Sequence, residues 1–490
     1  MTRNAEGETL DPDDWEEMRR LAHRMVDDAI DHTARLRERP VWQEMPEEVR
    51  EGYGDGLPRQ GRALGEVYDD LVARLMPYPM GNVHPRFWMW FMGSSNFTGA
   101  LGDFLAAVQG SNLGGGNHAA AAMDRQVVDW MKQIVGFPPE ASGTLVSGGS
   151  VANLIGLTVA RNAMAGRDVR QEGVGDLPLR FYASDQMHGC HQTALETLGL
   201  GNGALRRIPS HADCTMDTGA LRRAIAADRA AGLMPACVIA TAGTVNTGAV
   251  DDLAAIAELC RAEGLWFHVD GCIGALVALA PGNGHRVRGI ARADSLAMDP
   301  HKWLHAPFEV GCCLVRDAAR HRGTFSLTSE YLELMRRGIA AAEFLHDYGL
   351  QTSRGFRALK VWMSLQEQGA DKFGRLIDQN IDQARGLARR LDGIAGVDVV
   401  APVSLNIVCF RLDPGDRDEA ALRALNTEVM LRLQESGRAA ISDTTVKGRH
   451  CLRAAIVNHR TRQEDLDLFV DALETVASEV IGAPAAPAAP

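Results

Sequence analysis

From about residue 140 to residue 316, short apolar or β-branched runs alternate with segments of helical periodicity. The runs cover residues 144–146, 181–183, 237–241, 265–269, 295–298 and 312–315. Helical patterns such as 151–163 and 251–263 separate several of them. This alternation predicts an α/β fold on a mostly parallel, doubly wound sheet. Because ligands of such sheets bind at the carboxyl ends of the strands, the residues after each run are the first site candidates.

The remaining segments predict further parts of the fold. Residues 11–37 indicate an amphipathic helix beginning at Asp11 and Pro12, whose apolar stripe must pack on its own domain or on a second subunit. A long helical stretch over 354–397 is followed by apolar runs at 405–410 and 451–457, which indicates a smaller α/β domain. We therefore expect a helical segment at 1–83, a large α/β domain at 84–365, a small C-terminal domain at 366–482 and a disordered Ala/Pro tail at 483–490.

Charge and cysteine usage exclude several classes of function. With 51 Lys+Arg and 63 Asp+Glu the formal net charge is −12, which argues against nucleic acid or an anionic membrane as a partner. The start of the chain is polar, with no secretory signal, and no apolar run approaches the ~20 residues that span a bilayer. Nine cysteines without a CxxC pair favour reduced thiols in the cytoplasm. His188, Cys190 and His191 lie close together in MHGCH but lack further ligands at zinc spacing, so we predict no metal site.

The first candidate for ligand binding is the segment SGGSVAN at 147–153. Gly148 and Gly149 would let backbone amides approach a ligand, and Ser150 would cap the following helix. A strand, two glycines, a hydroxyl and a helix N-terminus together form an anion site suited to one phosphate. The alternative is an ordinary strand–turn–helix connection with a serine cap.

Three further candidates follow later runs of the predicted sheet. His188 is by itself compatible with a purely structural histidine. Asp270 ends an apolar run and needs a positive partner, which is either an arginine, a helix N-terminus or the protonated ring nitrogen of a cofactor. Lys302 lies between two apolar runs beside Trp303, and its half-buried position predicts a lowered pKa that suits Schiff-base chemistry; the alternative is a surface lysine. An anion site, a stacking group, an acid and an amine together are what pyridoxal 5'-phosphate requires.

Four segments extend this argument to a family: DPHKW at 299–303, HVDGC at 268–272, SGGSVAN at 147–153 and SDQMH at 184–188. In sequence and order the chain resembles the group II pyridoxal-phosphate amino-acid decarboxylases, of the bacterial aromatic-L-amino-acid decarboxylase type. The likeness runs from HPRFWMWF at 84–91 to RGFRALKVWM at 354–363 and continues weakly to 461. It implies a fold-type I architecture with a seven-stranded-type sheet, a homodimer whose N-terminal segments pack on the partner, and an active site at the subunit interface.

The resemblance also implies roles for individual residues. Lys302 would bond the cofactor's aldehyde, Asp270 would meet its pyridine nitrogen and His188 would stack on its ring. The expected phosphate contacts are Gly149, Ser150 and His301, with Thr244 near the ring or the phosphate. Tyr331 falls where family members carry a mobile-loop tyrosine that protonates Cα. The residues expected near the substrate are Trp90, Phe91, Asn112, His118 and Arg354.

The chain also departs from the family pattern. Val151 stands where a Glu usually follows the phosphate-site serine, and Cys272 where an Ala usually packs beneath the ring, either as a tight steric neighbour or as a reactive thiol. The glycine-rich segment 106–122 lacks the usual aromatic groups. The expected reaction is decarboxylation of an L-amino acid to an amine and CO2, with an aromatic substrate as the default. The alternatives are a polar or acidic substrate, an oxygen-using aldehyde synthase, a carbon–carbon lyase, or a catalytically silent pyridoxal-phosphate-binding or scaffold protein.

Overall fold

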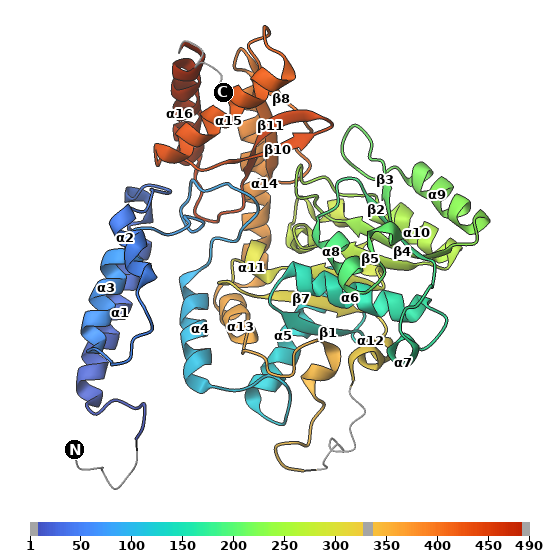
Figure 1. Ribbon diagram of the computed structural model, residues 1–490, viewed down its shortest axis with the longest axis horizontal. Helices are drawn as coiled ribbons and strands as arrows, with labels where there is room; N and C mark the ends of the chain where they lie inside the picture. Colours follow the sequence, from blue (N-terminus) through green and yellow to red (C-terminus); the bar gives the residue numbers. More distant parts are fainter. Residues whose placement is uncertain (1–7, 327–336, 483–490) are drawn as a thin grey trace.

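A computed structural model describes residues 8–326 and 337–482 of the chain (Figure 1). The predicted catalytic tyrosine, Tyr331, and the Ala/Pro tail at 483–490 lie outside the described residues. Among the described residues, no helix is both long enough and apolar enough to cross a lipid bilayer.

A seven-stranded sheet forms the centre of the molecule, in the order β1-β7-β6-β5-β4-β2-β3. Its strands are β1 (Ser142–Val146), β2 (Leu179–Ser184), β3 (Leu205–Ile208), β4 (Met234–Thr241), β5 (Trp266–Asp270), β6 (Ser295–Met298) and β7 (Gly311–Val315). The neighbouring pairs from β6 to β3 are parallel, whereas β7 pairs antiparallel with both β1 and β6. The expected mostly parallel sheet is therefore confirmed.

Helices cover both faces of this sheet, and alternate side chains of β4 pack into two different hydrophobic clusters. Val238 and Ala240 belong to one hydrophobic cluster, while Cys237 and Ile239 belong to another. Successive side chains of a strand point to opposite faces, so the sheet is buried on both sides. The first cluster includes residues of α5 (Ala119–Val135), α9 (Thr218–Ala230) and α10 (Leu253–Glu263), and the second includes residues of α6 (Gly149–Met164) and α8 (Cys190–Thr197). Shorter helices α7 (Val169–Glu172), α11 (Pro300–Trp303) and α12 (Ala318–Phe325) complete this part.

A second, four-stranded antiparallel sheet has its own core near the C-terminus. Its strands are β8 (Val397–Val399), β9 (Ile407–Leu412), β10 (Ser442–Val446) and β11 (Arg449–Ala455), in the order β10-β11-β9-β8. The helices that share its core are α14 (Ala370–Asp392), α15 (Glu419–Glu435) and α16 (Gln463–Gly482), whereas α13 (Ala358–Gln368) packs against α5 in the core of the large sheet. The helical stretch predicted over 354–397 is thus two helices, because Gly369 adopts a φ of +72° that ends the first.

The N-terminal helices lie to one side of both sheets (Figure 1). They are α1 (Trp15–Ala34), α2 (Glu47–Glu51) and α3 (Leu64–Arg74), followed by α4 (Phe97–Gln109). The expected cap at Asp11 was wrong: Asp14 caps α1, since its Oδ1 accepts from the backbone N–H groups of Glu16 and Glu17. No residue of α1 is fully buried within the single chain, so its predicted apolar stripe is only partly covered, and Val26 and Ile30 are exposed.

All six predicted runs are strands, whereas β3 was missed. This strand reads Leu-Arg-Arg-Ile and lies at the edge of the sheet, paired with β2 alone. Its two consecutive arginines interrupt the apolar run by which the other strands were recognised. Charged residues of this kind are typical of edge strands, which have one unpaired side facing solvent.

Candidate active site

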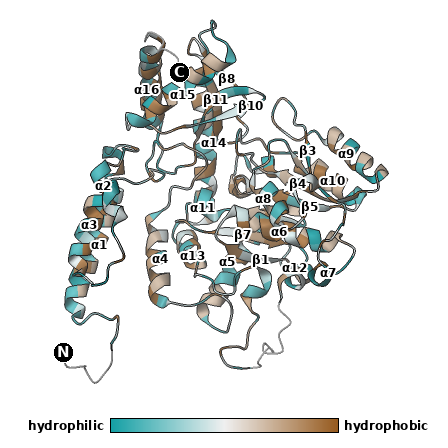
Figure 2. Ribbon diagram, in the orientation of Figure 1, coloured by the Kyte–Doolittle hydropathy of each residue, from teal (hydrophilic) through white to brown (hydrophobic). Residues whose placement is uncertain are grey.

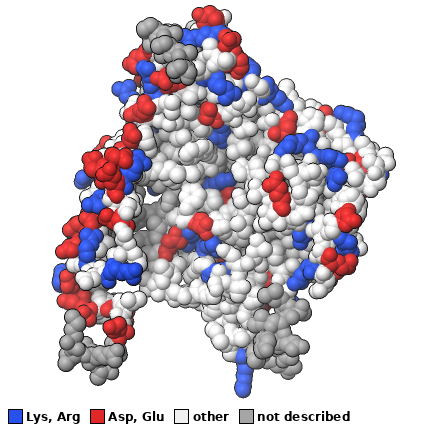
Figure 3. Space-filling view, viewed as in Figure 1, with Lys and Arg blue, Asp and Glu red and all other residues white. Residues whose placement is uncertain are grey.

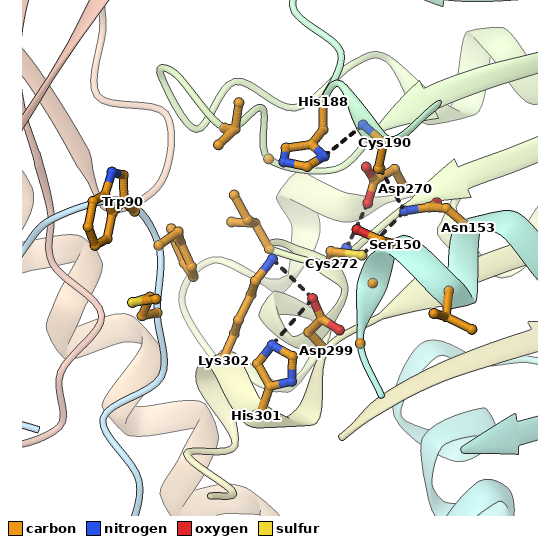
Figure 4. Close-up of a pocket in the computed structure, with 18 of the residues that line it drawn as sticks. Trp90, Ser150, Asn153, His188, Cys190, Asp270, Cys272, Asp299, His301 and Lys302 are labelled. Atoms are coloured by element: carbon orange, nitrogen blue, oxygen red, sulfur yellow. Dashed lines mark hydrogen bonds and ion pairs between the residues drawn. The ribbon is translucent and has the colours of Figure 1, made fainter. Parts of the chain in front are cut away.

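A cavity of about 570 Å³ opens where the carboxyl ends of the parallel strands meet (Figure 4). Its walls come from the segments after β1, β2, β4, β5 and β6, together with residues 90–92 from the segment before α4. This is the position that the strand-end rule predicts for a ligand. The lining residues are Trp90, Phe91, Met92, Ser147, Gly148, Gly149, Ser150, Val151, Asn153, His188, Cys190, Thr241, Gly243, Val245, Asp270, Cys272, Ile273, Asp299, His301 and Lys302.

The N-terminus of α6 faces this cavity. Gly148 is the N-cap, so the expected cap at Ser150 was wrong; Ser150 lies in the first turn. Gly149 has no room for a side chain, because an added Cβ would lie 2.3 Å from Sγ of Cys272 and 2.7 Å from Oδ2 of Asp299. The backbone of this turn can therefore approach a ligand closely, and first-turn N–H groups of a helix have no intrahelical acceptors.

Lys302 lies in α11, the short helix that follows β6. Its Nζ is 3.0 Å from Oδ2 of Asp299, whose other carboxylate oxygen is buried without a partner among the described residues. Burial alone would lower the pKa of Lys302, but the negative charge of Asp299, with contributions from Cys272 and Asp270, raises it above its ordinary value. The predicted lowered pKa of Lys302 was therefore wrong, because that prediction considered burial of the amine and not the Asp299 carboxylate three residues earlier.

Asp270 ends β5 and is buried in the cavity wall. Oδ2 lies 3.0 Å from Nε2 of the fully buried His191, and Oδ1 accepts the backbone N–H of Cys272 at 3.1 Å. Burial raises the pKa of the Asp270 carboxyl, but hydrogen bonding and charge from His191, with help from Cys272 and Lys302, bring it well below the ordinary value. The cavity wall therefore holds an ionised carboxylate that is shielded from solvent.

His188 lies across the cavity from Lys302, on the loop between β2 and α8 (Figure 4). Its Nδ1 accepts the backbone N–H of Cys190 at 3.1 Å, which orients the ring. Burial lowers the pKa of His188, which favours the neutral imidazole over the charged imidazolium. His301 is oriented in a similar way, since its Nδ1 accepts from the N–H of Val310 at 3.3 Å.

A buried polar network supports the floor of the cavity. Nδ1 of His268 lies 2.7 Å from Oγ of Ser295, and its Nε2 lies 2.8 Å from Oδ1 of Asn153. The Asn153 amide nitrogen in turn lies 3.6 Å from Sγ of Cys272. Burial raises the pKa of the Cys272 thiol well above its ordinary value, which favours the steric interpretation of this residue over the reactive thiol.

Two aromatic residues line the cavity mouth. Phe91 is buried and packs edge-on against Trp303 at a centroid distance of 5.4 Å. Trp90 is 48% exposed and has a φ of +50°, and its carbonyl accepts from Nη1 of Arg453 at 2.6 Å. The Arg453 contact holds this unusual backbone conformation.

Four of the predicted site residues do not line the cavity within one chain. The Thr244 hydroxyl is buried against Thr247 and the N–H of Ala249, although its neighbours at 243 and 245 face the cavity. Oδ1 of Asn112 accepts two backbone N–H groups, and Nδ1 of His118 caps α5. Arg354 is buried against Asp124 and the carbonyl of Leu145. Their roles toward cofactor or substrate stay predictions.

Asp299, His191 and Asn153 belong to the site or support it, although the sequence patterns did not predict them. Asp299 directly follows β6 and is the N-cap of α11, so the rule that ligands bind at strand ends could have identified it, as it did Asp270. His191 was considered only as a zinc ligand. Cys190, His191 and Asp270 do place possible ligand atoms within 4.8 Å of one another. However, the histidine–carboxylate hydrogen bond accounts for this cluster without an ion.

Comparison with known proteins agrees with this geometry. Residues 46–413 match the pyridoxal-dependent decarboxylase conserved domain. The chain is 34% identical to an aromatic-L-amino-acid decarboxylase of Bacillus atrophaeus, over 95% of this chain and 96% of that protein. It is 28% identical to a phenylacetaldehyde synthase of Arabidopsis thaliana, over 92% of this chain and 94% of the relative.

A solved structure supports the same relationship. The crystal structure of Oryza sativa TDC with PLP and tryptamine superposes with a TM-score of 0.88 at 27% identity, covering 96% of this chain and 99% of that one. Sequence match, fold and site geometry agree over nearly the whole chain. The chain therefore belongs to the pyridoxal-dependent decarboxylase family, as a carboxy-lyase that uses pyridoxal phosphate.

Proposed function

We propose that this enzyme decarboxylates an aromatic L-amino acid to the corresponding amine and CO2. The observation that carries the proposal is the convergence of Lys302, Asp270 and the N-terminus of α6 on one cavity. Phe91 and Trp90 add aromatic surface to the mouth of that cavity, and Met92, Val245 and Ile273 add apolar surface. Relatives named for aromatic amino acids or phenylacetaldehyde support the same substrate class.

The residues around the cavity fit pyridoxal phosphate. Gly149 leaves no space for a Cβ where the phosphate would approach the backbone, and Asp299 has a buried oxygen without a partner among the described residues. In the proposed assignment Nζ of Lys302 bonds the aldehyde and the Asp270 carboxylate meets the pyridine nitrogen. His188 covers a face of the ring. The proposed phosphate contacts are Gly149, Ser150 and His301, with Thr244 near the ring or the phosphate.

The protein's contribution to catalysis is mainly orientation and proton placement. When bound, pyridoxal phosphate supplies an electron sink for the bond that breaks. Asp270, held as an anion, would keep a proton at the ring nitrogen. Asp299 lies within hydrogen-bond distance of the Lys302 amine, so it can share the proton that this amine must lose before it reacts. The apolar walls would exclude water from the breaking bond.

Tyr331 is proposed as the acid that protonates Cα after CO2 leaves. It lies outside the described residues, so the assignment rests on its place in SEYLELMRRG, where the family carries a loop tyrosine. Loss of this protonation step is the route to the second candidate, an oxygen-using aldehyde synthase. That candidate is favoured by the relationship to the phenylacetaldehyde synthase.

The decisive experiment is a substrate panel with purified holoenzyme, in which CO2 and amine are both measured. We expect tryptophan, tyrosine, phenylalanine or dopa to give equal amounts of CO2 and amine. Glutamate, aspartate and cysteine sulfinate test the polar alternative. Turnover restricted to these acidic substrates would overturn the aromatic assignment.

The covalent attachment has a separate test. Borohydride reduction followed by peptide mapping should place the cofactor on Lys302. The Lys302→Ala variant should lose the yellow absorbance band, whereas the matched variant of the exposed Lys372 should keep it. An adduct on another lysine would contradict the site assignment, and a wild-type protein with no adduct would favour a scaffold protein that does not bind the cofactor.

We also propose that the active unit is a homodimer, in line with the implied architecture. The apolar side of α4 exposes Phe104 by 59% and Val108 by 70% in the single chain (Figure 2). On α1, Val26 and Ile30 are also exposed, although charged residues cover much of α1–α3 (Figure 3). A second copy of the chain would bury both surfaces. Light scattering of the holoenzyme should give twice the mass of one chain, and a monomer would contradict this.

A cytoplasmic location is the accompanying proposal. All nine cysteines are free thiols, eight of them buried, a usage typical of a reducing compartment. Fractionation of the native host tests it directly, since activity in the secreted fraction would contradict it.

A further inference from the structure

A buried histidine outside the cavity lining holds the carboxylate of Asp270. His191 lies in the first turn of α8, and its side chain has no exposed surface. Nε2 of His191 is 3.0 Å from Oδ2 of Asp270, a side chain that is only 7% exposed. The other oxygen, Oδ1, accepts from the backbone N–H of Cys272. Both oxygens of Asp270 are therefore hydrogen-bonded, Oδ1 to the backbone just after β5 and Oδ2 to the side chain of His191 on α8.

The surroundings of Asp270 make the His191 contact important. The titratable groups near it are His188 before α8, Cys190 at the start of α8, Lys302 and Asp299 from the α11 region, and His268 and Cys272 from β5 and the segment after it. Among the described residues, the hydrogen bonds to the Asp270 carboxylate come from the His191 ring and from the backbone N–H of Cys272. An ionised carboxylate can only accept, so Nε2 of His191 must carry the proton.

We propose that His191 is a positioning residue that keeps Asp270 ionised and fixed in one rotamer, so that the carboxylate can hold a protonated pyridine nitrogen. This inference rests on the proposed function of the cavity. Nδ1 of His191 is buried without a partner among the described residues, so the ring gains little from its surroundings besides the contact with Asp270. A packing role alone would be served equally well by an apolar side chain of similar size.

The test compares two variants of similar volume. Gln at position 191 can place an N–H donor near the position of Nε2, whereas Leu cannot donate. We expect His191→Gln to keep the affinity of the apoenzyme for pyridoxal phosphate within roughly threefold, and His191→Leu to weaken it roughly tenfold or more. Affinity is measured by titrating apoenzyme with the cofactor and following absorbance, which does not depend on turnover.

A pH series separates electrostatic positioning from packing. Without the His191 donor the pKa of Asp270 should rise, so cofactor affinity of His191→Leu should fall further than that of His191→Gln as the pH is lowered. Equal affinities and parallel pH profiles for the two variants would overturn the proposal. Weakening by Gln as large as that by Leu would also overturn it, because the donor would then not be the relevant feature.

Two further measurements keep the inference testable. If His191→Leu does not fold, His191→Met replaces it, and ¹⁵N-histidine spectra of the wild-type apoenzyme should show a slowly exchanging Nε2 proton that is absent from His191→Gln. Absence of that proton from the wild type would contradict the proposal. Tight Zn²⁺ binding by the apoenzyme that requires Cys190 and His191 would instead assign the cluster to a metal. A wild-type protein that binds no pyridoxal phosphate would refute the proposed function itself, whereas tight binding by both variants refutes only the role of His191.

Discussion

Nζ of Lys302 lies 3.0 Å from Oδ2 of Asp299, three residues earlier at the N-cap of α11. The side chains are 19% and 3% exposed, so water screens this pair weakly. Burial would favour the neutral amine, whereas the charge of Asp299 favours the ammonium form. The protonation of the reactive lysine thus depends on a carboxylate three residues earlier, at the cap of the same short helix.

Replacing Asp299 by Asn should therefore lower the pKa of Lys302, since the opposing carboxylate is removed while burial remains. Labelling of the apoenzyme with an amine-selective reagent across a pH series, read by peptide mapping, should show the Lys302 midpoint moving down by about one unit or more. Asp371→Asn, an exposed change on α14, is the control. An unchanged midpoint would show that Asp299 does not govern the amine.

Much of the site was predictable because its groups follow strands. Asp270, Lys302 and His188 each come shortly after an apolar run, and parallel strands bring such positions to one edge. The contact between His191 and Asp270 joins residues 79 positions apart, and its existence depends on how α8 packs over β5. Periodicity does not encode that packing. Asn112 and His118 illustrate the converse, since polar residues in a glycine-rich segment satisfy backbone groups as readily as ligands.

Gly149→Ala should weaken binding of pyridoxal phosphate. The new Cβ would lie 2.3 Å from Sγ of Cys272 and 2.7 Å from Oδ2 of Asp299, so the turn at the start of α6 must move. Removing the sulfur in Gly149→Ala/Cys272→Ala should restore part of the affinity. Gly189→Ala is a matched control, because nothing lies within 4 Å of a Cβ there. Cofactor titration of the four proteins checks this, and equal affinity for wild type and Gly149→Ala would contradict the close approach.

His321 should make the protein less stable in acid. The ring is fully buried beside Ser142, and burial lowers the pKa of His321 to about 3 from an ordinary 6.5. Between these two pH values His321 is protonated in the unfolded chain but neutral in the folded chain. The contribution of His321 to stability is therefore fully present above about pH 6.5 and is lost as the pH falls toward 3. His321→Gln should flatten this dependence in urea unfolding series, whereas exposed His23→Gln should not. A slope unchanged by His321→Gln would exclude the residue as a contributor.

Tyr331→Phe should divert the reaction. If Tyr331 supplies the proton at Cα, its loss should lower the amine yield and raise aldehyde, with O2 consumed, while CO2 release continues. The measurement is the ratio of amine to aldehyde per CO2 in aerobic and anaerobic reactions. Tyr348→Phe, the same substitution at a tyrosine later in the chain, controls for general disturbance. An amine yield equal to that of the wild type would remove Tyr331 from the mechanism.

Arg354 offers a choice between supporting the fold and binding substrate. Nη2 of Arg354 lies 3.4 Å from both oxygens of Asp124 and 2.9 Å from the carbonyl of Leu145, and both charged side chains are at most 4% exposed. Arg354→Met leaves the Asp124 charge buried and uncompensated, so we expect the free energy of unfolding to fall by about 3–5 kcal/mol.

The double variant Arg354→Met/Asp124→Leu separates the two roles, because removing both charges together should recover most of the lost stability. Urea unfolding measures stability, and steady-state kinetics of the folded double variant measures the effect on substrate. A recovered stability with KM near the wild-type value would assign Arg354 to the fold. If instead Arg354→Met raises KM strongly while stability is unchanged, the residue binds substrate, and the buried ion pair is not what retains it.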